Sequence, residues 1–237
     1  MQDKVVQDVD GSEGTGVWSN MEAVRLHIPA PTLAAAHFIR IASADRAQRL
    51  RVKDTLDGSF PPEKLHLTDA EERHGFLEDL RVATYVACLA SFVQGMNVID
   101  VADRENKWCI DFATVVQVWR AGCIIQADYI ADMLEEVWKH DGKAEDRNLL
   151  YNDRVAHELK HGFPSLRKVV TRGVESNAVI PSLSATLEYL KFSADTVLPT
   201  KFYEAELDYF GKHMFDLTSE PAGKPVKGKH HFEWKPA

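Results

Sequence analysis

The sequence lacks the features that mark nucleic-acid-binding and membrane-bound proteins. Its 28 Lys and Arg residues are outnumbered by 36 Asp and Glu residues, so the net charge is −8. An acidic chain offers no basic surface for nucleic acid and no polybasic patch for a membrane. No apolar run approaches the roughly 18 residues of a membrane-spanning helix. We therefore expect neither nucleic acid nor a membrane as a partner.

Cysteine is also scarce. Cys88, Cys109 and Cys123 have no metal-ligand spacing and fall in apolar helical patterns, so we expect buried free thiols in a reducing compartment. The histidine pairs at residues 157 and 161 and at residues 230 and 231 have no third ligand at suitable spacing. The first residues, MQDKVVQDVDG, lack the basic-then-apolar order of a signal peptide. These absences predict a cytoplasmic protein without a metal site.

β-Strand signals are nearly absent, and only residues 5–9 have strand character. Apolar residues instead recur at helical spacing in two long segments, residues 80–101 and 111–138. The first is apolar over so much of its surface that it should lie in the middle of a helix bundle. Gly95 and Gly122 fall inside these segments, where glycine costs about 1 kcal/mol relative to alanine. Close helix–helix contact at both glycines is the expected compensation.

Shorter helices are predicted at residues 19–27, 31–44, 45–55, 149–160, 163–177, 182–195 and 200–215. Residues 19–22 and 68–71 each match the capping box, with Ser or Thr as N-cap and Glu three residues later. Gly, Pro and Lys after residue 217 predict a non-helical tail, in which Phe232 and Trp234 need a surface to bury against. We therefore expect an all-α helical domain over residues 1–217 and an extended tail over residues 218–237, packed on a partner subunit.

Three motifs carry a resemblance to a known family. The stretch GTGVWSNMEA resembles the GTGKWT segment of 6-phosphogluconate dehydrogenases. VVQVWRAGCIIQADYI is similar to the family's WRGGCIIR helix, and ELDYFGKHMFD resembles its QRDYFGAH segment. Order and spacing agree over essentially all 237 residues. The chain thus resembles the helical C-terminal domain of this pentose phosphate pathway family.

The resemblance implies a homodimer that threads each tail through the partner subunit and binds a small-molecule ligand in the cleft between subunits. It also implies that NADP is held by a Rossmann domain that precedes the helical domain. The sequence contains no strand–GxGxxG–helix unit of that kind. We expect no cofactor in this chain, and NADP only where an upstream Rossmann domain exists.

The same resemblance nominates a substrate site in which two family cations are replaced. Val17 stands for the lysine of the GTGKW loop, and Leu207 stands for an arginine that reaches in from the other subunit. A family arginine that binds phosphate matches Arg46, and the final motif histidine is kept as His213. The implied substrate-binding set is Val17, Trp18, Ser19, Arg46, Leu207 and His213, with Arg46 and His213 as candidate catalytic residues. Since each charge-assisted hydrogen bond is worth about 1.5–3 kcal/mol, phosphorylated sugar acids should bind several orders of magnitude more weakly.

From the residues alone, structural roles stand beside these assignments. Ser19 fits a helix N-cap, Trp18 a core residue or a hydrophobic staple, and Gly14 and Gly16 turn glycines. Arg46 fits a solvated helix face, and His213 fits the end of a helix, where it complements the dipole.

Three functions remain open. The first is a stand-alone, non-redox protein with a repurposed cleft, such as a cofactor-free isomerase, lyase or cyclase. The second is the C-terminal part of an NADP-dependent dehydrogenase that acts on 6-phosphogluconate or another 3-hydroxy acid. The third is a non-catalytic dimeric scaffold.

Overall fold

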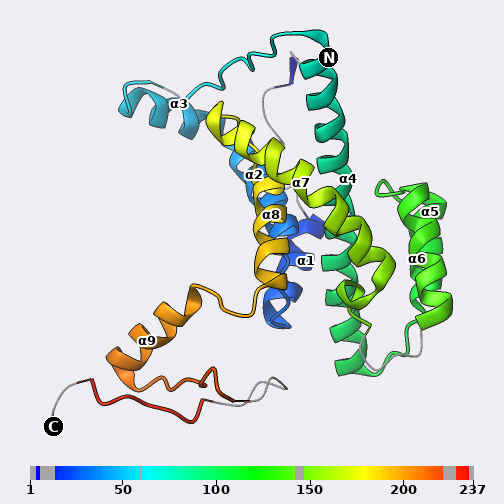
Figure 1. Ribbon diagram of the computed structural model, residues 1–237, viewed down its shortest axis with the longest axis vertical. Helices are drawn as coiled ribbons and strands as arrows, with labels where there is room; N and C mark the ends of the chain where they lie inside the picture. Colours follow the sequence, from blue (N-terminus) through cyan, green and yellow to red (C-terminus); the bar gives the residue numbers. More distant parts are fainter. Residues whose placement is uncertain (1–3, 6–13, 59, 142–146, 221–227, 235–237) are drawn as a thin grey trace. The chain divides into compact units, whose positions relative to one another are not determined.

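The computed structural model describes residues 4–5, 14–58, 60–141, 147–220 and 228–234. Every named element in these residues is a helix (Figure 1), which confirms the predicted all-α class. The chain divides into two compact units, Met1–Tyr189 and Leu190–Ala237. The boundary lies inside helix α8, Pro181–Ala194, and the predicted tail shares the second unit with the helix that precedes it. Residues 6–9 of the predicted strand lie outside the described residues.

Helices α4 (Ala70–Asn106) and α7 (Asp153–Glu175) pack along each other in the middle of the first unit (Figure 1). The fully buried apolar side chains of α4 recur at helical spacing and include Leu89, Val93 and Met96. This confirms the predicted central helix. By length and composition α4 is also the one helix of the described residues that could cross a membrane, but the core helix of a soluble protein passes the same test.

The close contact between α4 and α7 depends on a glycine that the sequence did not single out. A Cβ atom at Gly162 of α7 would lie 2.1 Å from Cγ2 of Val86, far inside van der Waals contact. Gly95 and Gly122 have no neighbouring atom within 4 Å of such a Cβ position. The prediction that these two glycines mark close helix contacts is therefore wrong, and Gly162 takes that role.

The long helix predicted at residues 111–138 is two helices, α5 (Phe112–Gly122) and α6 (Asp128–Asp141), which lie side by side (Figure 1). Cys123 ends α5 in an extended conformation, directly after the weak helix former Gly122. Arg120 then joins the two helices through Asp132, with 2.5 Å between Nη1 and Oδ1. The break turns one predicted helix into a hairpin.

The opposite error occurs in α7. The sequence predicted two helices, at residues 149–160 and 163–177, and Pro164, which cannot donate a helix hydrogen bond, lies at the start of the second. The structure has a short 3₁₀ turn, η2 (Leu149–Tyr151), followed by one continuous α7 with Pro164 inside it. Packing of its buried face against α4 outweighs the lost hydrogen bond.

Helices α1 (Gly14–Arg25) and α2 (Pro31–Ala44) pack on each other and on α4. A buried polar network joins α2 to α4 and α8. Gln94 donates from Nε2 to Thr32 Oγ1 and accepts from the Thr32 N–H, at 2.8 and 3.0 Å, and the Thr32 and Thr186 hydroxyls lie 3.0 Å apart. Because every buried partner is satisfied, the network fixes how these helices meet.

Two capping predictions are shifted in register. Ser19 lies inside α1 and donates to the Gly16 carbonyl at 3.2 Å, so it is not an N-cap, and Gly14 and Gly16 are helical rather than turn residues. The N-cap of α4 is Asp69, one residue after the predicted threonine. Asp69 accepts from the Glu72 N–H at 2.8 Å, and the Glu72 side chain accepts from the N–H of Thr68, one residue before the N-cap, at 2.8 Å.

The cysteines are less buried than their apolar surroundings predicted. Cys88 and Cys109 are exposed, and Cys123 is half-buried. Partial desolvation of the Cys88 thiol nevertheless raises the pKa of Cys88 above its ordinary value. The expectation of three buried thiols is therefore wrong, because apolar neighbours in the sequence do not fix which face of a helix is covered.

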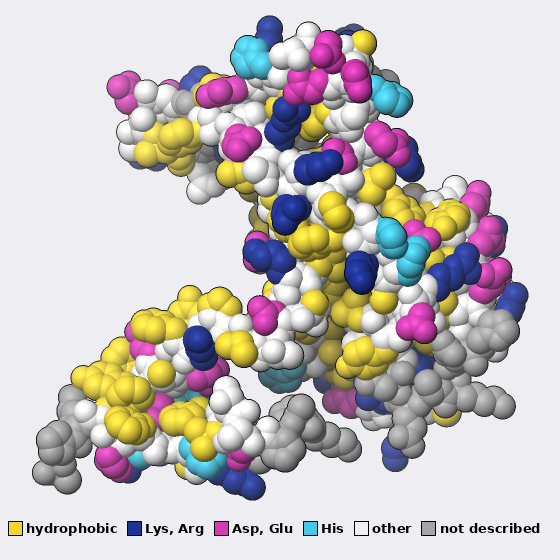
Figure 2. Space-filling view, viewed as in Figure 1, with side chains coloured by type: hydrophobic (Ala, Val, Ile, Leu, Met, Phe, Trp, Pro, Cys, Tyr) yellow, Lys and Arg dark blue, Asp and Glu magenta, His cyan; other side chains and the backbone are white. Residues whose placement is uncertain are grey.

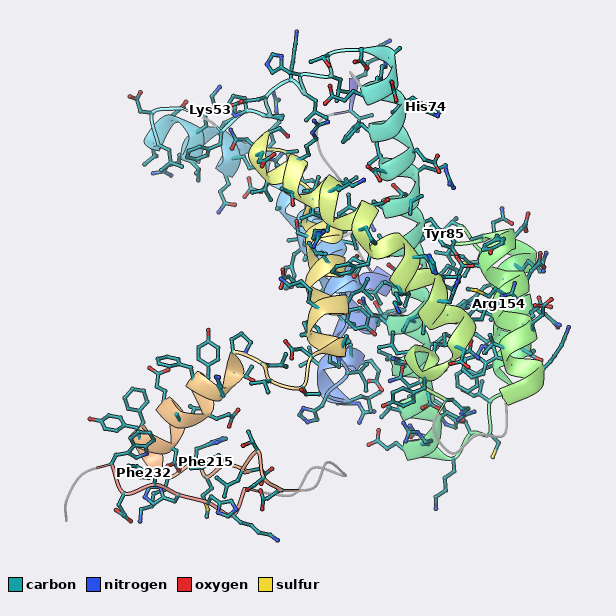
Figure 3. The ribbon with its side chains drawn as sticks, viewed as in Figure 1. Lys53, His74, Tyr85, Arg154, Phe215 and Phe232 are labelled. Atoms are coloured by element: carbon teal, nitrogen blue, oxygen red, sulfur yellow. The ribbon has the colours of Figure 1, made fainter. Side chains whose placement is uncertain are left out.

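The second unit consists of α9 (Thr200–Gly211) and the segments that follow it. Phe215 and His230 form an antiparallel bridge, with N···O distances of 2.9 and 3.1 Å. Gly228 allows this approach, since a Cβ atom there would lie 2.8 Å from the backbone of Met214. Figure 3 shows Phe215 and Phe232 on the two segments that run beside α9.

Candidate functional site

Three of the predicted site residues lie within two turns of α1. Val17 and Trp18 are exposed, and Trp18 shows 70% of its surface to solvent. The structural prediction of Trp18 as a core residue is therefore wrong. Ser19 is also exposed, and its hydroxyl donates to the Gly16 carbonyl. The first turns of α1 thus present an apolar side chain, an indole and a hydroxyl to solvent at these three positions.

Helix α2 supplies residues to this region that the sequence did not reveal. A Cβ atom at Gly16 would lie only 2.5 Å from His37 Nδ1, so the imidazole packs directly on the backbone of α1. Arg40 follows three residues later and projects from the same side of α2. The sequence signal for this contact is the glycine itself, which permits the close approach of a ring.

Arg46 lies on a different helix from these residues. It is the first residue of α3 (Arg46–Thr55), directly after the N-cap Asp45, and is exposed. α3 buries none of its residues. Among the described residues, no hydrogen bond or ion pair joins Arg46 to Ser19. The position fits a solvated helix face as well as it fits a ligand site.

The remaining two predicted site residues belong to the second unit. Leu207 lies on α9 and is 44% exposed. His213 follows the end of α9 and lies between Lys212 and Met214, which both adopt the left-handed conformation, with φ of 52° and 66°. Its Nδ1 lies 3.7 Å from a carboxylate oxygen of Glu204. The histidine is thus held on a sharp turn with its ring in solvent.

Asp208 is the structural centre of this unit, a role that no pattern in the sequence indicated. Its carboxylate accepts from His231 Nδ1 at 3.0 Å, from the Phe232 N–H at 3.1 Å and from Trp234 Nε1 at 3.0 Å. It also accepts from the Met214 N–H at 3.0 Å. Burial opposes ionisation, but these hydrogen bonds outweigh it and hold the pKa of Asp208 well below its ordinary value.

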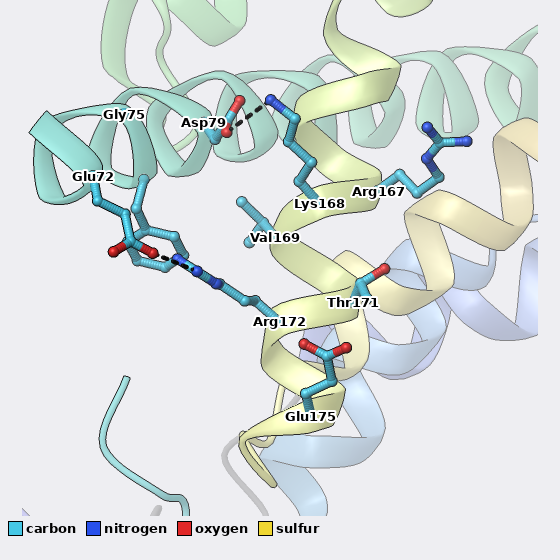
Figure 4. Close-up of a pocket in the computed structure, with 10 residues that line it drawn as sticks. Glu72, Gly75, Asp79, Arg167, Lys168, Val169, Thr171, Arg172 and Glu175 are labelled. Atoms are coloured by element: carbon cyan, nitrogen blue, oxygen red, sulfur yellow. Dashed lines mark hydrogen bonds and ion pairs between the residues drawn. The ribbon is translucent and has the colours of Figure 1, made fainter. Parts of the chain in front are cut away.

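A pocket of about 490 Å³ lies between α4 and α7 in the first unit (Figure 4). Arg172 pairs with Glu72 at 2.7 Å, and Lys168 pairs with Asp79 at 3.3 Å. The N–H of Thr68, the Arg172 guanidinium and the Thr68 hydroxyl all donate to Glu72 and lower its pKa to about 2. Two of the three cations that line the pocket are thus paired across it, which joins the two helices.

The histidine pairs do not build a metal site. In the part of the chain that the structure describes, no group of three or more His, Cys, Asp or Glu side chains could hold a metal ion. The rings of His157 and His161 lie 4.0 Å apart on α7. His230 lies 3.1 Å from Glu220 of the tail, and His231 is bound to Asp208 of α9.

Comparison with known proteins agrees with the resemblance in the motifs. A family model described as 6-phosphogluconate dehydrogenase, C-terminal domain, matches residues 1–234. The decarboxylating 6-phosphogluconate dehydrogenase of Emericella nidulans is 46% identical over 99% of this chain and 47% of its own length. A decarboxylating 6-phosphogluconate dehydrogenase of Arabidopsis thaliana is 31% identical over 98% of this chain and 46% of its own length.

The fold agrees as well. A solved structure of Plasmodium falciparum 6-phosphogluconate dehydrogenase, described in its apo form and in complex with NADP+ and with 6-phosphogluconate, matches 99% of this chain. Its TM-score is 0.84 at 28% identity, and the match covers 47% of that protein. The chain therefore spans about half the length of the relatives it matches, and it belongs to the 6-phosphogluconate dehydrogenase family, whose C-terminal domain it forms.

Proposed function

We propose that this chain is the C-terminal half of an NADP-dependent decarboxylating dehydrogenase that acts on 6-phosphogluconate or on a related 3-hydroxy acid. The observation that carries the proposal is the match of the chain, over residues 1–234, to the C-terminal domain of enzymes of that name. The relatives give no support to a cofactor-free isomerase, lyase or cyclase.

The described residues contain no unit of the kind that holds NADP in a Rossmann domain. A dinucleotide site of the Rossmann type needs a strand, a glycine-rich turn and a helix in succession. The described residues contain no such unit, and the first glycines of α1 are already helical. When bound to another part of the enzyme, NADP would accept the hydride, and this chain would bind and orient the substrate.

The residues available for that task are two clusters with different charge. α1 and α2 contribute Ser19, His37 and Arg40, which can bind hydroxyl and anionic groups. The second unit contributes His213, which can donate or accept a proton, and Leu207, which adds an apolar contact. Because Val17 and Leu207 stand where the resemblance implies a lysine and an arginine, a non-phosphorylated 3-hydroxy acid fits better than 6-phosphogluconate.

A second copy of the chain belongs to the proposal. Figure 2 shows hydrophobic side chains gathered over the second unit. The large exposed side chains of α9 are Phe202, Tyr203, Leu207, Tyr209 and Phe210. An apolar surface of this kind on a small unit indicates an interface. A homodimer with exchanged tails would cover it, and sedimentation equilibrium should give the mass of two chains.

A chimaera tests the enzymatic part. The N-terminal half of the Emericella nidulans relative is joined to this chain, and NADP reduction is measured with 6-phosphogluconate and with a panel of non-phosphorylated 3-hydroxy acids. We expect turnover of at least one hydroxy acid. Absence of NADP reduction with every substrate, while the complete Emericella nidulans enzyme is active in the same assay, would rule the function out.

The variant Leu207→Arg tests how much the absence of a cation at this position lowers activity with 6-phosphogluconate. If the resemblance places Leu207 correctly, restoring a cation should raise kcat/KM of the chimaera for 6-phosphogluconate by about ten- to a hundredfold, the value of one charge-assisted hydrogen bond. Leu207→Gln is the matched control, because it adds a polar side chain without charge. An equal response to both variants would contradict a phosphate-binding role at this position.

A further inference from the structure

Asp208 is the only buried residue among the described residues of the second unit, where it is 1% exposed. A buried carboxylate is costly unless its oxygens are hydrogen-bonded. Here both oxygens have partners: Oδ1 accepts from Met214 and His231, and Oδ2 accepts from His231, Phe232 and Trp234. A neutral side chain of the same size cannot satisfy four such donors.

The same residue also holds both neighbours of His213. The Lys212 N–H donates to the backbone carbonyl of Asp208 at 3.1 Å, and the Met214 N–H donates to its carboxylate at 3.0 Å. Both neighbours have positive φ, a conformation that costs about 1 kcal/mol or more for a residue with a side chain. The strained turn persists because Asp208 binds it on both sides.

The tail also binds the Asp208 carboxylate. His231 and Trp234, which follow the Phe215–His230 bridge, donate to the carboxylate that binds Met214. Tyr209 of α9 packs edge-on against the Trp234 ring, with 6.0 Å between ring centroids. The tail therefore reaches the turn of His213 through this buried carboxylate, beside the close approach of Gly228 to the Met214 backbone and the 3.7 Å contact of Lys212 with Glu233.

We propose that Asp208 is a positioning residue for His213: its ionised carboxylate couples the docked tail to the turn that presents the imidazole. The proposal rests on the proposed function insofar as His213 meets a substrate. A carboxylate that served only as a tail anchor would not need the Met214 bond, whereas a positioning group must touch the turn itself.

Kinetics of the chimaera test the proposal through a double-mutant cycle. Asp208→Asn should lower kcat/KM by about ten- to a hundredfold, the cost of a misplaced active group. In the His213→Ala background the same substitution should cause less than about a twofold further loss, because the residue it acts through is gone. Equal losses in both backgrounds would overturn the proposal and leave a purely structural role.

Glu220→Gln is the matched control. Glu220 binds His230 at 3.1 Å and the Leu217 N–H at 2.8 Å, so it is a second acidic contact of the tail with no bond to the turn of His213. We expect kcat/KM to stay within about twofold of the parent. If circular dichroism shows that Asp208→Asn does not fold, Trp234→Phe replaces it, because this variant removes one donor and keeps the carboxylate. Its smaller loss of kcat/KM should likewise disappear in the His213→Ala background.

A measurement on the chain alone separates this proposal from the proposed function. With histidines labelled by ¹⁵N, the His213 ring resonances should shift or broaden in Asp208→Asn, while those of His74 on α4 stay unchanged. Unaltered His213 resonances would overturn the positioning role even in an active chimaera. An inactive chimaera with altered His213 resonances would instead contradict only the function.

Discussion

The two units of this chain are stabilised in opposite ways. In the first unit, α4 and α7 bury Leu89, Met96 and Leu166 completely, and close approach at Gly162 makes the contact tight. Among the described residues of the second unit, the one that is buried is the carboxylate Asp208, while aromatic side chains such as Phe210, 72% exposed, face solvent. The first unit has an apolar core of its own, whereas the second is organised by hydrogen bonds and leaves its apolar area for another surface.

The difference assigns different tasks to the two units. A tight apolar core fixes helix positions and makes a rigid frame. A unit built on one polar centre, with its hydrophobic side chains outside, gains most of its stability when a partner covers them. Under the proposed function, the second unit would serve both as the dimer interface and as the element that carries Leu207 and His213.

Leucine truncations provide the largest test of this comparison. Leu89→Ala should reduce the free energy of unfolding by about 2–5 kcal/mol, because it opens a cavity in a fully buried site. Leu207→Ala removes the same atoms from an exposed site and should change the free energy of unfolding of the monomer by less than about 0.5 kcal/mol. Urea denaturation at low protein concentration measures both values.

Protein concentration then sharpens the result. If a second copy covers α9, the cost of Leu207→Ala should rise as dimers form, while the cost of Leu89→Ala should stay constant. A large, concentration-independent cost at Leu207 would show that the second unit has an apolar core that the comparison denies it.

Arginine substitutions test the site on the first unit. Arg40 lies on the helix that packs against α1, whereas Arg46 opens a helix with no buried residues. In the chimaera, Arg40→Ala should lower kcat/KM by about tenfold or more, as expected for a lost charge-assisted hydrogen bond. Arg46→Ala should have less than about a twofold effect. The reverse order would support the sequence-based choice of Arg46.

The sequence was sufficient for the fold class, for the family and for most helix positions, because long apolar stripes and intact motifs report them directly. It failed where tertiary contacts decide. α7 continues through Pro164 since its buried face packs on α4, and α5 ends at Gly122 although the apolar pattern continues. Periodicity records which residues are apolar and not where the chain turns.

The site was harder to predict for a related reason. Trp18 and Ser19 were given structural roles from local patterns, yet Trp18 faces solvent and Ser19 lies inside α1 instead of capping it. His37 and Asp208 were missed because their partners lie far along the chain or on another helix: Gly16 for the first, and residues 231–234 for the second. A motif shows that Asp208 is present but not that four donors converge on it.

The smallest expected effect concerns acid, and it compares the polar anchors of the two units. Glu72, which joins α4 to α7, has a pKa lowered from 4.5 to about 2 by donors from Thr68 and Arg172. Because the folded-state pKa is depressed, its contribution to stability is fully present above pH 4.5 and is lost as the pH falls through about 2. Glu72→Gln should therefore have a lower urea midpoint than the parent at pH 7, and the two midpoints should converge towards pH 2.

Glu71→Gln, an exposed neighbour on the same turn, serves as the control and should show no such convergence. If the difference in urea midpoint between Glu72→Gln and the parent stayed constant down to pH 2, Glu72 would act through packing and not through its charge. The first unit would then not depend on an ionised carboxylate of the kind that Asp208 supplies in the second.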